Sequence, residues 1–381
     1  MRLKLFAAVA CAAVAGGLFL ADYTPPAAAQ ARYNTEAASV EVTRLVSGLD
    51  IPWAVAPLPE GGALITERDG RLLHFDAQWR RKTVAGVPEV AASGQGGLLD
   101  ITLAADFATT GTLFLTYSEP AGRGARTAMA AARLSEDRSS LEDVTVLFQQ
   151  EPALRGGRHF GSRVVEAADG TLFVTTGDRG DRPLAQDPQG HVGKVVRIAR
   201  DGSVPEDNPF ADGESALPEI WSIGHRNIQG ATLDEEGRLW TLSHGARGGD
   251  EVNLAEAGKN YGWPVISYGR HYSGLSIGEG TAQEGMEQPK FYWDPSIAPS
   301  GMVAYTGDAI PAWRGDLFVG ALKFDYIARL ERDGDRILGE EKLFEDIYPR
   351  IRDVVMGPDG TLWFLSEGEG ALYSVSAAGS G

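Results

Sequence analysis

A short pattern that recurs six times is the feature that most constrains how this chain can fold. Each copy consists of a turn glycine, an apolar run rich in strand-forming residues, and a polar end. Steps of roughly 40–60 residues filled with short strands and glycine-rich turns are typical of β-propeller blades. The sequence therefore predicts an all-β fold, a six-bladed β-propeller. The copies begin at Gly61, Gly111, Gly170, Gly237, Gly315 and Gly360.

The turns before these strands favour hairpins over crossover helices. Acidic residues precede the glycine at Asp169, Glu236 and Asp359, which is common hairpin-turn chemistry. No long amphipathic helical pattern recurs between the copies, so βαβ units are disfavoured. A seven-bladed ring with one degenerate copy and a β-sandwich are the alternatives. We expect a single propeller domain over residues 30–381.

Residues 1–29 have the composition of an export signal. Arg2 and Lys4 begin it, a long apolar run follows, and small residues end it at 27–29. This order is typical of a cleaved secretory signal, so we expect a periplasmic or secreted protein. An uncleaved anchor and a lipoprotein signal at Cys11 are the alternatives. No later stretch is long and apolar enough to cross a bilayer, so the mature chain is expected to have no membrane span.

Charge and cysteine content exclude several classes of function. The net charge is −17, and residues 1–29 contribute Arg2, Lys4 and Asp22, so their removal leaves −18. Nucleic acid and anionic membranes are poor partners for such a chain. Because Cys11 is the only cysteine, the mature chain has no disulfide, thiolate metal site or cysteine nucleophile. The acidity suits oxygen-ligated cations such as calcium, although a solvated surface explains it equally well.

A histidine and an aspartate flank the third repeat. In a propeller the loops around the inner strands surround a central channel, so polar residues just beyond a strand converge on one face. His159 lies in a glycine-rich segment before the repeat, and Asp178 ends it. A histidine whose tautomer is set by a carboxylate is the usual general base. A loop histidine bonded to backbone is the alternative.

Basic residues near three other repeats are candidates for binding an anion. Arg226, followed by Asn227, precedes the fourth repeat, and an arginine can hold a carboxylate or carbonyl oxygen. Lys323 follows the fifth repeat, and Arg350 and Arg352 alternate on an expected strand before the sixth. Cations that converge on one mouth suit a ligand with several carboxylates. Turn stabilisation and ordinary salt bridges are the alternatives.

The segment after the fourth repeat combines glycines with adjacent carboxylates. It runs from Gly245 to Asn253 and includes Asp250 and Glu251. Calcium binds carboxylate and main-chain carbonyl oxygens, and the spacing does not match an EF-hand. A calcium site and a solvated acidic loop fit this segment equally well.

These segments, in this order, resemble the soluble pyrroloquinoline quinone (PQQ)-dependent glucose and aldose sugar dehydrogenases, and the bacterial aldose sugar dehydrogenase branch most of all. The resemblance extends from about Gly48 to Ser374. It rests on seven segments, which are residues 94–99, 193–197, 202–209, 224–230, 250–253, 260–264 and 298–301.

The resemblance implies oxidation of an aldose at its anomeric carbon to a lactone, with PQQ and calcium as cofactors. His159 matches the base that takes the hydroxyl proton while hydride passes to PQQ, and Asp178 matches its orienting carboxylate. Arg226 matches the catalytic arginine at the quinone oxygens. The other cofactor contacts implied are Gln95, Asn227, Lys323, Arg350 and Arg352.

The resemblance also implies metal ligands. The family's active-site calcium takes backbone oxygens from a Gly-Pro pair, which is Gly245-Ala246 here, and the alanine removes the fixed φ of proline. Structural calcium is implied at Glu251 with Tyr261. A second site is implied near Arg270 and Tyr272.

Three other functions remain open from the sequence. The same cofactor could serve another polyol or aldehyde such as sorbosone, and a calcium-dependent propeller lactonase shares the fold. A cofactor-free binding propeller of the cell envelope is the third. The preferred sugar is open, and the soluble electron acceptor (a quinone, dye or cytochrome) is not identified by any residue.

Overall fold

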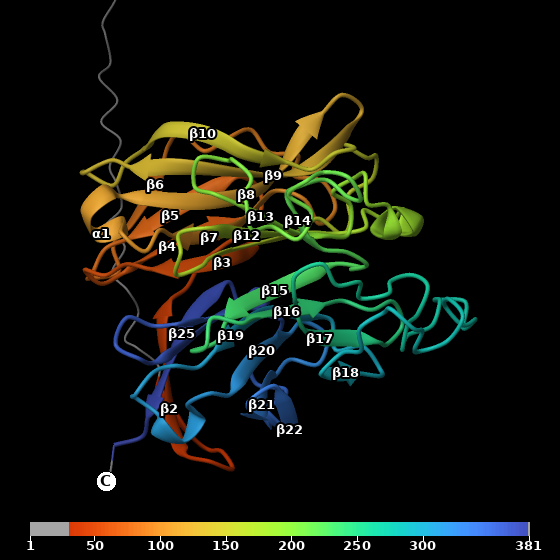
Figure 1. The fold of residues 1–381 in the computed structure, drawn as a ribbon. Helices are drawn as coiled ribbons and strands as arrows, with labels where there is room; N and C mark the ends of the chain where they lie inside the picture. The colour runs from red at the N-terminus through yellow and green to blue at the C-terminus, as the bar shows by residue number, and fades with distance from the viewer. Residues whose placement is uncertain (1–29, 380–381) are drawn as a thin grey trace, which may run out of the picture.

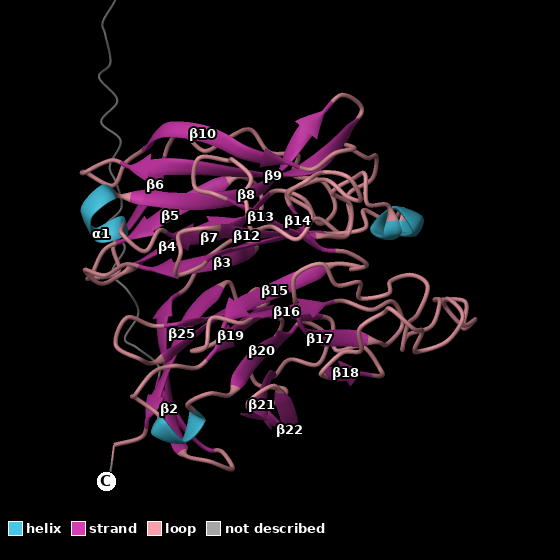
Figure 2. Cartoon of the chain, viewed as in Figure 1, coloured by secondary structure: helices cyan, strands magenta, loops and turns pink. Residues whose placement is uncertain are grey.

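The structure is a computed structural model that describes residues 30–379, and its strands form six separate sheets (Figures 1 and 2). Each sheet contributes its first strand to a central ring, in which β3, β7, β11, β15, β19 and β23 contact one another in turn and the last contacts the first. The expected six-bladed propeller is thereby confirmed. The predicted export signal lies outside the described residues.

The first three blades follow one another along the chain, each an antiparallel sheet of four strands. Blade 1 contains β3 (Pro52–Pro57), β4 (Ala63–Glu67), β5 (Arg71–Phe75) and β6 (Arg81–Val84). Blade 2 contains β7 (Leu98–Leu103), α1 (Phe107–Thr110), β8 (Thr112–Ala121), β9 (Gly124–Leu134) and β10 (Leu141–Gln149). Blade 3 contains β11 (Gly161–Glu166), β12 (Leu172–Thr176), a 3-10 helix (Arg182–Gln186), β13 (Val195–Ile198) and β14 (Ile220–Ser222).

The remaining blades complete the ring, and the last is built from both ends of the described chain. Blade 4 contains β15 (Ile228–Leu233), β16 (Leu239–Ser243), β17 (Asp250–Leu254) and β18 (Phe291–Trp293). Blade 5 contains β19 (Pro299–Ala304), a 3-10 helix (Pro311–Trp313), β20 (Leu317–Ala321), β21 (Ile327–Asp333) and β22 (Arg336–Leu343). Blade 6 contains β23 (Ile351–Met356), β24 (Leu362–Ser366), β25 (Ala371–Ala377), β2 (Ser39–Val46) and β1 (Gln30–Asn34).

Blade 6 closes the ring because an N-terminal strand pairs with the C-terminal one. β2 runs antiparallel to β25, with Val40 opposite Ala377 and Val46 opposite Leu372. β1 then adds to the outer edge of β2. The pairing replaces an open seam between the first and last blades with backbone hydrogen bonds.

The repeated sequence pattern corresponds to the second strand of each blade. In five of these strands, β4, β12, β16, β20 and β24, every residue is buried. Neighbouring blades cover both faces of such a strand, which explains why the pattern is a continuous apolar run and not an alternation. The glycine that begins each copy has φ between +69° and +93° in all six cases, a conformation that side chains resist.

The central channel is closed by a buried ion cluster on the inner strands. Arg163 on β11 is 2.9 Å from both Asp100 on β7 and Asp353 on β23. Its guanidinium also lies 4.5 Å from the ring centre of Trp53 on β3. All four side chains are buried. The cluster and Trp53 therefore separate one end of the channel from the other.

Candidate active site

Two adjoining cavities occupy the channel on one side of this cluster. The first, here called the dyad cavity, has a volume of about 440 Å³ and is lined by His159, Arg226 and Lys323. The second, the arginine cavity, has a volume of about 300 Å³ and is lined by Arg68, Arg350, Arg352 and Trp53. Both share the lining residues Gln95, Asn227, His244 and Ala298. Every blade contributes to the pair, as expected for loops that converge on a propeller axis.

His159 and Asp178 form a hydrogen-bonded dyad at the dyad cavity. The His159 Nδ1 lies 2.6 Å from Asp178 Oδ1, and the Nε2 nitrogen has no hydrogen-bond partner within residues 30–379. A carboxylate at Nδ1 favours the tautomer with its proton there and a lone pair on Nε2. Burial holds the pKa of His159 below its ordinary value, although the bond to Asp178 opposes this shift. The neutral ring is the form that can accept a proton.

Backbone geometry fixes the histidine in place. His159 has a φ of +54°, and its backbone N–H donates to Gln95 Oε1 at 2.7 Å. A Cβ at Gly177 would lie 2.0 Å from the His159 carbonyl oxygen. The glycine is therefore required for the loop that carries the histidine to pack against the end of the third repeat.

Asp178 is held by two further donors, neither of which was predicted from the sequence. Gly180 donates its N–H to Oδ1 at 2.7 Å, and the Trp263 indole donates to Oδ2 at 2.9 Å. Burial raises the pKa of Asp178, but the hydrogen bonds outweigh it and the net pKa lies below the usual value. Asp178 is thus an ionised carboxylate with both oxygens occupied, suited to orienting His159.

Gln95 and Asn227 present amide donors to both cavities. The Gln95 oxygen is occupied by the His159 N–H, and the Asn227 oxygen accepts from the Gly161 N–H at 3.1 Å. Because an N–H must meet the amide oxygen, the NH₂ group of each side chain is the part left for a ligand. Among the described residues that line the two cavities, none is Asp or Glu. Both cavities therefore favour an electron-rich, anionic ligand.

Arg226 is a buried cation with unused hydrogen-bonding capacity. Its Nη1 donates to the His244 carbonyl at 3.0 Å, and the guanidinium lies 5.3 Å from the ring centre of Trp263. The buried Nε has no hydrogen-bond partner within the described chain. A buried donor left unpaired is costly, so this group fits a site that is completed by a ligand oxygen.

The three other predicted cations reach the cavities but differ in their pairing. Lys323 lies at the mouth, where its Nζ donates to the Ser296 carbonyl at 3.3 Å and to no other group of the described chain. Arg350 and Arg352 share Glu367, with Arg350 at 2.8 Å from Oε1 and Arg352 at 2.6 Å from Oε2. The carboxylate offsets one of the two positive charges.

The expectation that Arg350 and Arg352 alternate on one strand is wrong. Arg350 precedes β23 and has a φ of +54°, while Arg352 lies within the strand. Glu367, at the end of the sixth repeat, brings the two guanidinium groups together instead. Glu367 was not among the residues predicted from the sequence.

Arg68 and Arg247 also line the cavities and were not assigned from the sequence. Arg68 follows β4 at the arginine cavity, and Arg247 lies at the dyad cavity. Arg68 ends the first repeat as Lys323 follows the fifth, so the rule that polar residues beyond a strand converge could have identified it.

The residues predicted to bind calcium do not form one compact cluster. Gly245 and Ala246 line the dyad cavity, and Glu251 on β17 faces a small void beside Gly245. Burial raises the pKa of Glu251 to about 7. The Tyr261 hydroxyl bonds the Leu254 carbonyl and the Glu256 N–H and does not turn to Glu251.

The second predicted metal pair is also separate. Arg270 pairs through its backbone with Arg247 and Ser276, and Tyr272 is 74% exposed at the dyad cavity. Across residues 30–379, no three His, Cys, Asp or Glu side chains are grouped as a metal site. Any calcium at Gly245 and Ala246 would therefore depend on backbone oxygens and on ligand oxygens.

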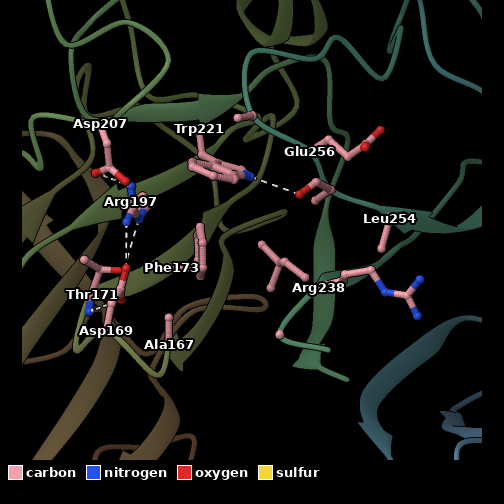
Figure 3. A pocket seen from close by; sticks show the side chains of 14 residues that line it. Ala167, Asp169, Thr171, Phe173, Arg197, Asp207, Trp221, Arg238, Leu254 and Glu256 are labelled. Carbon is pink, nitrogen blue, oxygen red and sulfur yellow. Dashed lines mark hydrogen bonds and ion pairs between the residues drawn. The ribbon is translucent and has the colours of Figure 1, made fainter. Parts of the chain in front are cut away.

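A cavity of similar size, about 420 Å³, lies between blades 3 and 4 but has different chemistry (Figure 3). Phe173, Trp221 and Leu239 form much of its lining. Its buried cation, Arg197, is already paired with Asp169 and Asp207, both at 2.8 Å. None of the described residues that line it is a histidine. The channel cavities are thus the better candidate for an active site.

The fold and this site define a propeller oxidoreductase, and comparison with known proteins gives its family. Residues 49–374 match the glucose/sorbosone dehydrogenase family. The chain belongs to that family and is a sugar dehydrogenase.

Two sugar dehydrogenases of this family are similar to the chain over most of its length. The aldose sugar dehydrogenase YliI of Escherichia coli is 45% identical over 346 residues, which cover 89% of this chain and 93% of the relative. Quinoprotein glucose dehydrogenase B of Acinetobacter calcoaceticus is 26% identical and covers 84% of each chain.

Solved structures agree with the sequence comparison. The apo form of the soluble aldose sugar dehydrogenase of E. coli superimposes with a TM-score of 0.86 and 44% identity, covering 89% of this chain and all of the other. The PQQ-bound aldose sugar dehydrogenase of Streptomyces coelicolor gives a TM-score of 0.74 at 26% identity, covering 93% of this chain and all of the other. Over residues 30–379, no helix has the length and apolar character needed to span a membrane.

Proposed function

We propose that this protein oxidises aldose sugars at the anomeric carbon to lactones, with PQQ and calcium as cofactors. The observation that carries the proposal is a histidine–aspartate dyad that faces two cavities. The described residues that line these cavities supply hydrogen-bond donors and cations but no carboxylate. PQQ is a tricarboxylate quinone, and such a lining suits it. The relatives named as a quinoprotein and as a PQQ-bound enzyme support the same assignment.

His159, Asp178 and Arg226 have different roles in the proposed oxidation. PQQ, when bound with calcium, supplies the electron acceptor for the hydride that leaves the anomeric carbon. His159 accepts the hydroxyl proton at Nε2, and Asp178 stabilises the imidazolium that forms. The C1–H and O–H bonds break and the carbonyl of the lactone forms. Arg226 places positive charge where negative charge develops in the transition state.

The other polar residues hold the cofactor. Gln95 and Asn227 would donate their NH₂ groups, and Lys323, Arg350 and Arg352 would meet carboxylates. The backbone carbonyls of Gly245 and Ala246 would hold the active-site calcium. Glu251 with Tyr261, and the region of Arg270 and Tyr272, are proposed only as structural calcium sites.

Location and partners are part of the proposal. The export signal expected over residues 1–29 supports a periplasmic or secreted enzyme of one propeller domain, and the reduced cofactor would pass electrons to a soluble acceptor. The lactonase alternative is less favourable because such sites gather carboxylates around the metal, whereas these cavities are lined by cations.

Reconstitution tests the assignment. Apo-protein from a host without PQQ should reduce a redox dye with aldoses only when PQQ and calcium are both added. His159→Ala should retain PQQ binding while kcat falls by about 10²–10⁴-fold, the usual range for positioned proton transfer. Dye reduction measured with a panel of aldoses and with sorbosone identifies the preferred substrate. Activity with NAD alone, or lactone hydrolysis without PQQ, would overturn the assignment.

A further inference from the structure

The arginine cavity holds three guanidinium groups, and their charges are unequally available. Arg350 and Arg352 both donate to Glu367, whose side chain is only 12% exposed. Two cations that share one buried carboxylate together present about one net positive charge to a ligand. Arg68 has no hydrogen-bond or ion-pair partner for its guanidinium within the described residues. It is therefore the one arginine of this cavity whose charge is not offset.

The backbone around Arg68 directs its side chain. Its N–H donates to the Ile51 carbonyl and its carbonyl accepts from Leu98 N–H, both at 3.1 Å, so the residue is tied to blade 1 and to β7. Gly97 lies against it, because a Cβ at that position would be 1.7 Å from the Arg68 carbonyl oxygen and 2.7 Å from its Cγ. Gly97 has a φ of +144°. The stem of Arg68 is thus confined by neighbouring backbone, while its head group remains unpaired at the cavity.

We infer that Arg68 is a further cofactor-binding residue, which holds an anionic group of PQQ in the arginine cavity and contributes more to affinity than either Arg350 or Arg352. This inference rests on the proposed function. Arg68 lines the cavity together with Gln95 and Asn227, whose NH₂ groups are also free for a ligand. A confined, unpaired guanidinium loses little on binding a carboxylate, whereas an arginine already bonded to Glu367 must share or exchange its partner.

The test is direct PQQ binding to purified full-length apo-protein, measured by equilibrium dialysis with detection of the quinone absorbance. Arg68→Met removes the charge and retains an unbranched stem. Its dissociation constant for PQQ should rise about 10–150-fold, the range for one charge-assisted contact. Arg68→Lys should recover part of the loss. Arg81→Met removes one charge from β6 of the same blade, away from both cavities, and should change the dissociation constant by less than about twofold.

Two additional measurements separate a ligand contact from a structural role. PQQ trimethyl ester lacks the carboxylate charges, so wild type and Arg68→Met should bind it equally. The PQQ dissociation constant of wild type should also depend more steeply on salt than that of Arg68→Met. Thermal unfolding of each variant shows whether it is folded. If Arg68→Met does not fold, Arg68→Lys replaces it in the same binding measurements.

The results of these measurements distinguish failure of the role of Arg68 from failure of the proposed PQQ-dependent function. Unchanged PQQ affinity in folded Arg68→Met, or equal losses for PQQ and its ester, would overturn the role of Arg68 while leaving the proposed function intact. Wild-type protein that binds no PQQ would overturn the proposed function and this inference together. A selective loss for PQQ in Arg68→Met, larger than that in Arg350→Met, would support it.

Discussion

Replacing Asp178 with asparagine should separate proton transfer from cofactor binding. The Oδ1 atom of Asp178 faces His159 Nδ1 and the Gly180 N–H, and Oδ2 faces the Trp263 indole N–H. An amide has only one oxygen, so its NH₂ must meet a donor in either orientation. If the oxygen faces Trp263, the NH₂ donates to His159 and favours the tautomer that has no lone pair on Nε2.

The size of the expected loss in kcat follows from these contacts. A buried donor left without a partner costs about 1–3 kcal/mol, which is roughly 5–150-fold in rate if it falls on the transition state. Losing the correct tautomer adds to this loss, because positioned proton transfer contributes about 10²–10⁴-fold. We expect kcat of Asp178→Asn to fall by about 10²–10⁴-fold. PQQ affinity should change by less than about threefold, because Asp178 lines neither cavity.

Single-turnover kinetics provide the assay. PQQ-loaded protein is mixed rapidly with sugar, and reduction of the quinone is followed by absorbance. Asp181→Asn is the matched control, because Asp181 is an exposed residue three positions further along, and it should react at the wild-type rate. A reduction rate of Asp178→Asn within about threefold of wild type would refute the role assigned to the dyad.

Three further changes have defined outcomes. Because burial holds the pKa of His159 below 6.5, kcat/KM should fall as pH decreases through a midpoint below 6.5, and a pH–rate midpoint above 6.5 would contradict this. Glu367→Gln removes the carboxylate that two arginines share, so PQQ should bind more tightly in dialysis, and weaker binding by folded protein would contradict this. Arg163→Met leaves two buried carboxylates without their cation, so urea unfolding should show a loss of about 3–5 kcal/mol; an unchanged midpoint would count against the ion cluster.

The sequence predicted the fold because the same physical constraint acts on every blade. The second strand is buried along its whole length in five blades and over residues 113–118 in blade 2, so its apolar run and turn glycine recur without long-range information. The positions of His159 and Asp178 followed for a related reason, because residues just beyond strand ends converge on the axis. The structure brings those two residues into contact as expected.

The pairing of charges could not be predicted in the same way. The sequence predicted Arg350 and Arg352 as cations available to a ligand. In the structure both bond Glu367, which follows the next strand, β24. Trp263 belongs to a loop of blade 4 and reaches Asp178 of blade 3. Such contacts depend on side-chain directions between segments distant in sequence, which no local pattern encodes.

The pairing of β2 with β25 also has a consequence for how the protein is made. The ring cannot close until residues 371–377 have been synthesised, so the slowest contacts join strands more than 300 residues apart. Since all six blades line the two cavities, the cofactor site is completed only at that last step. A ligand that binds only the closed ring stabilises it by mass action. Supplying the cofactor early in refolding should therefore raise the yield of closed rings without changing how fast the individual blades form.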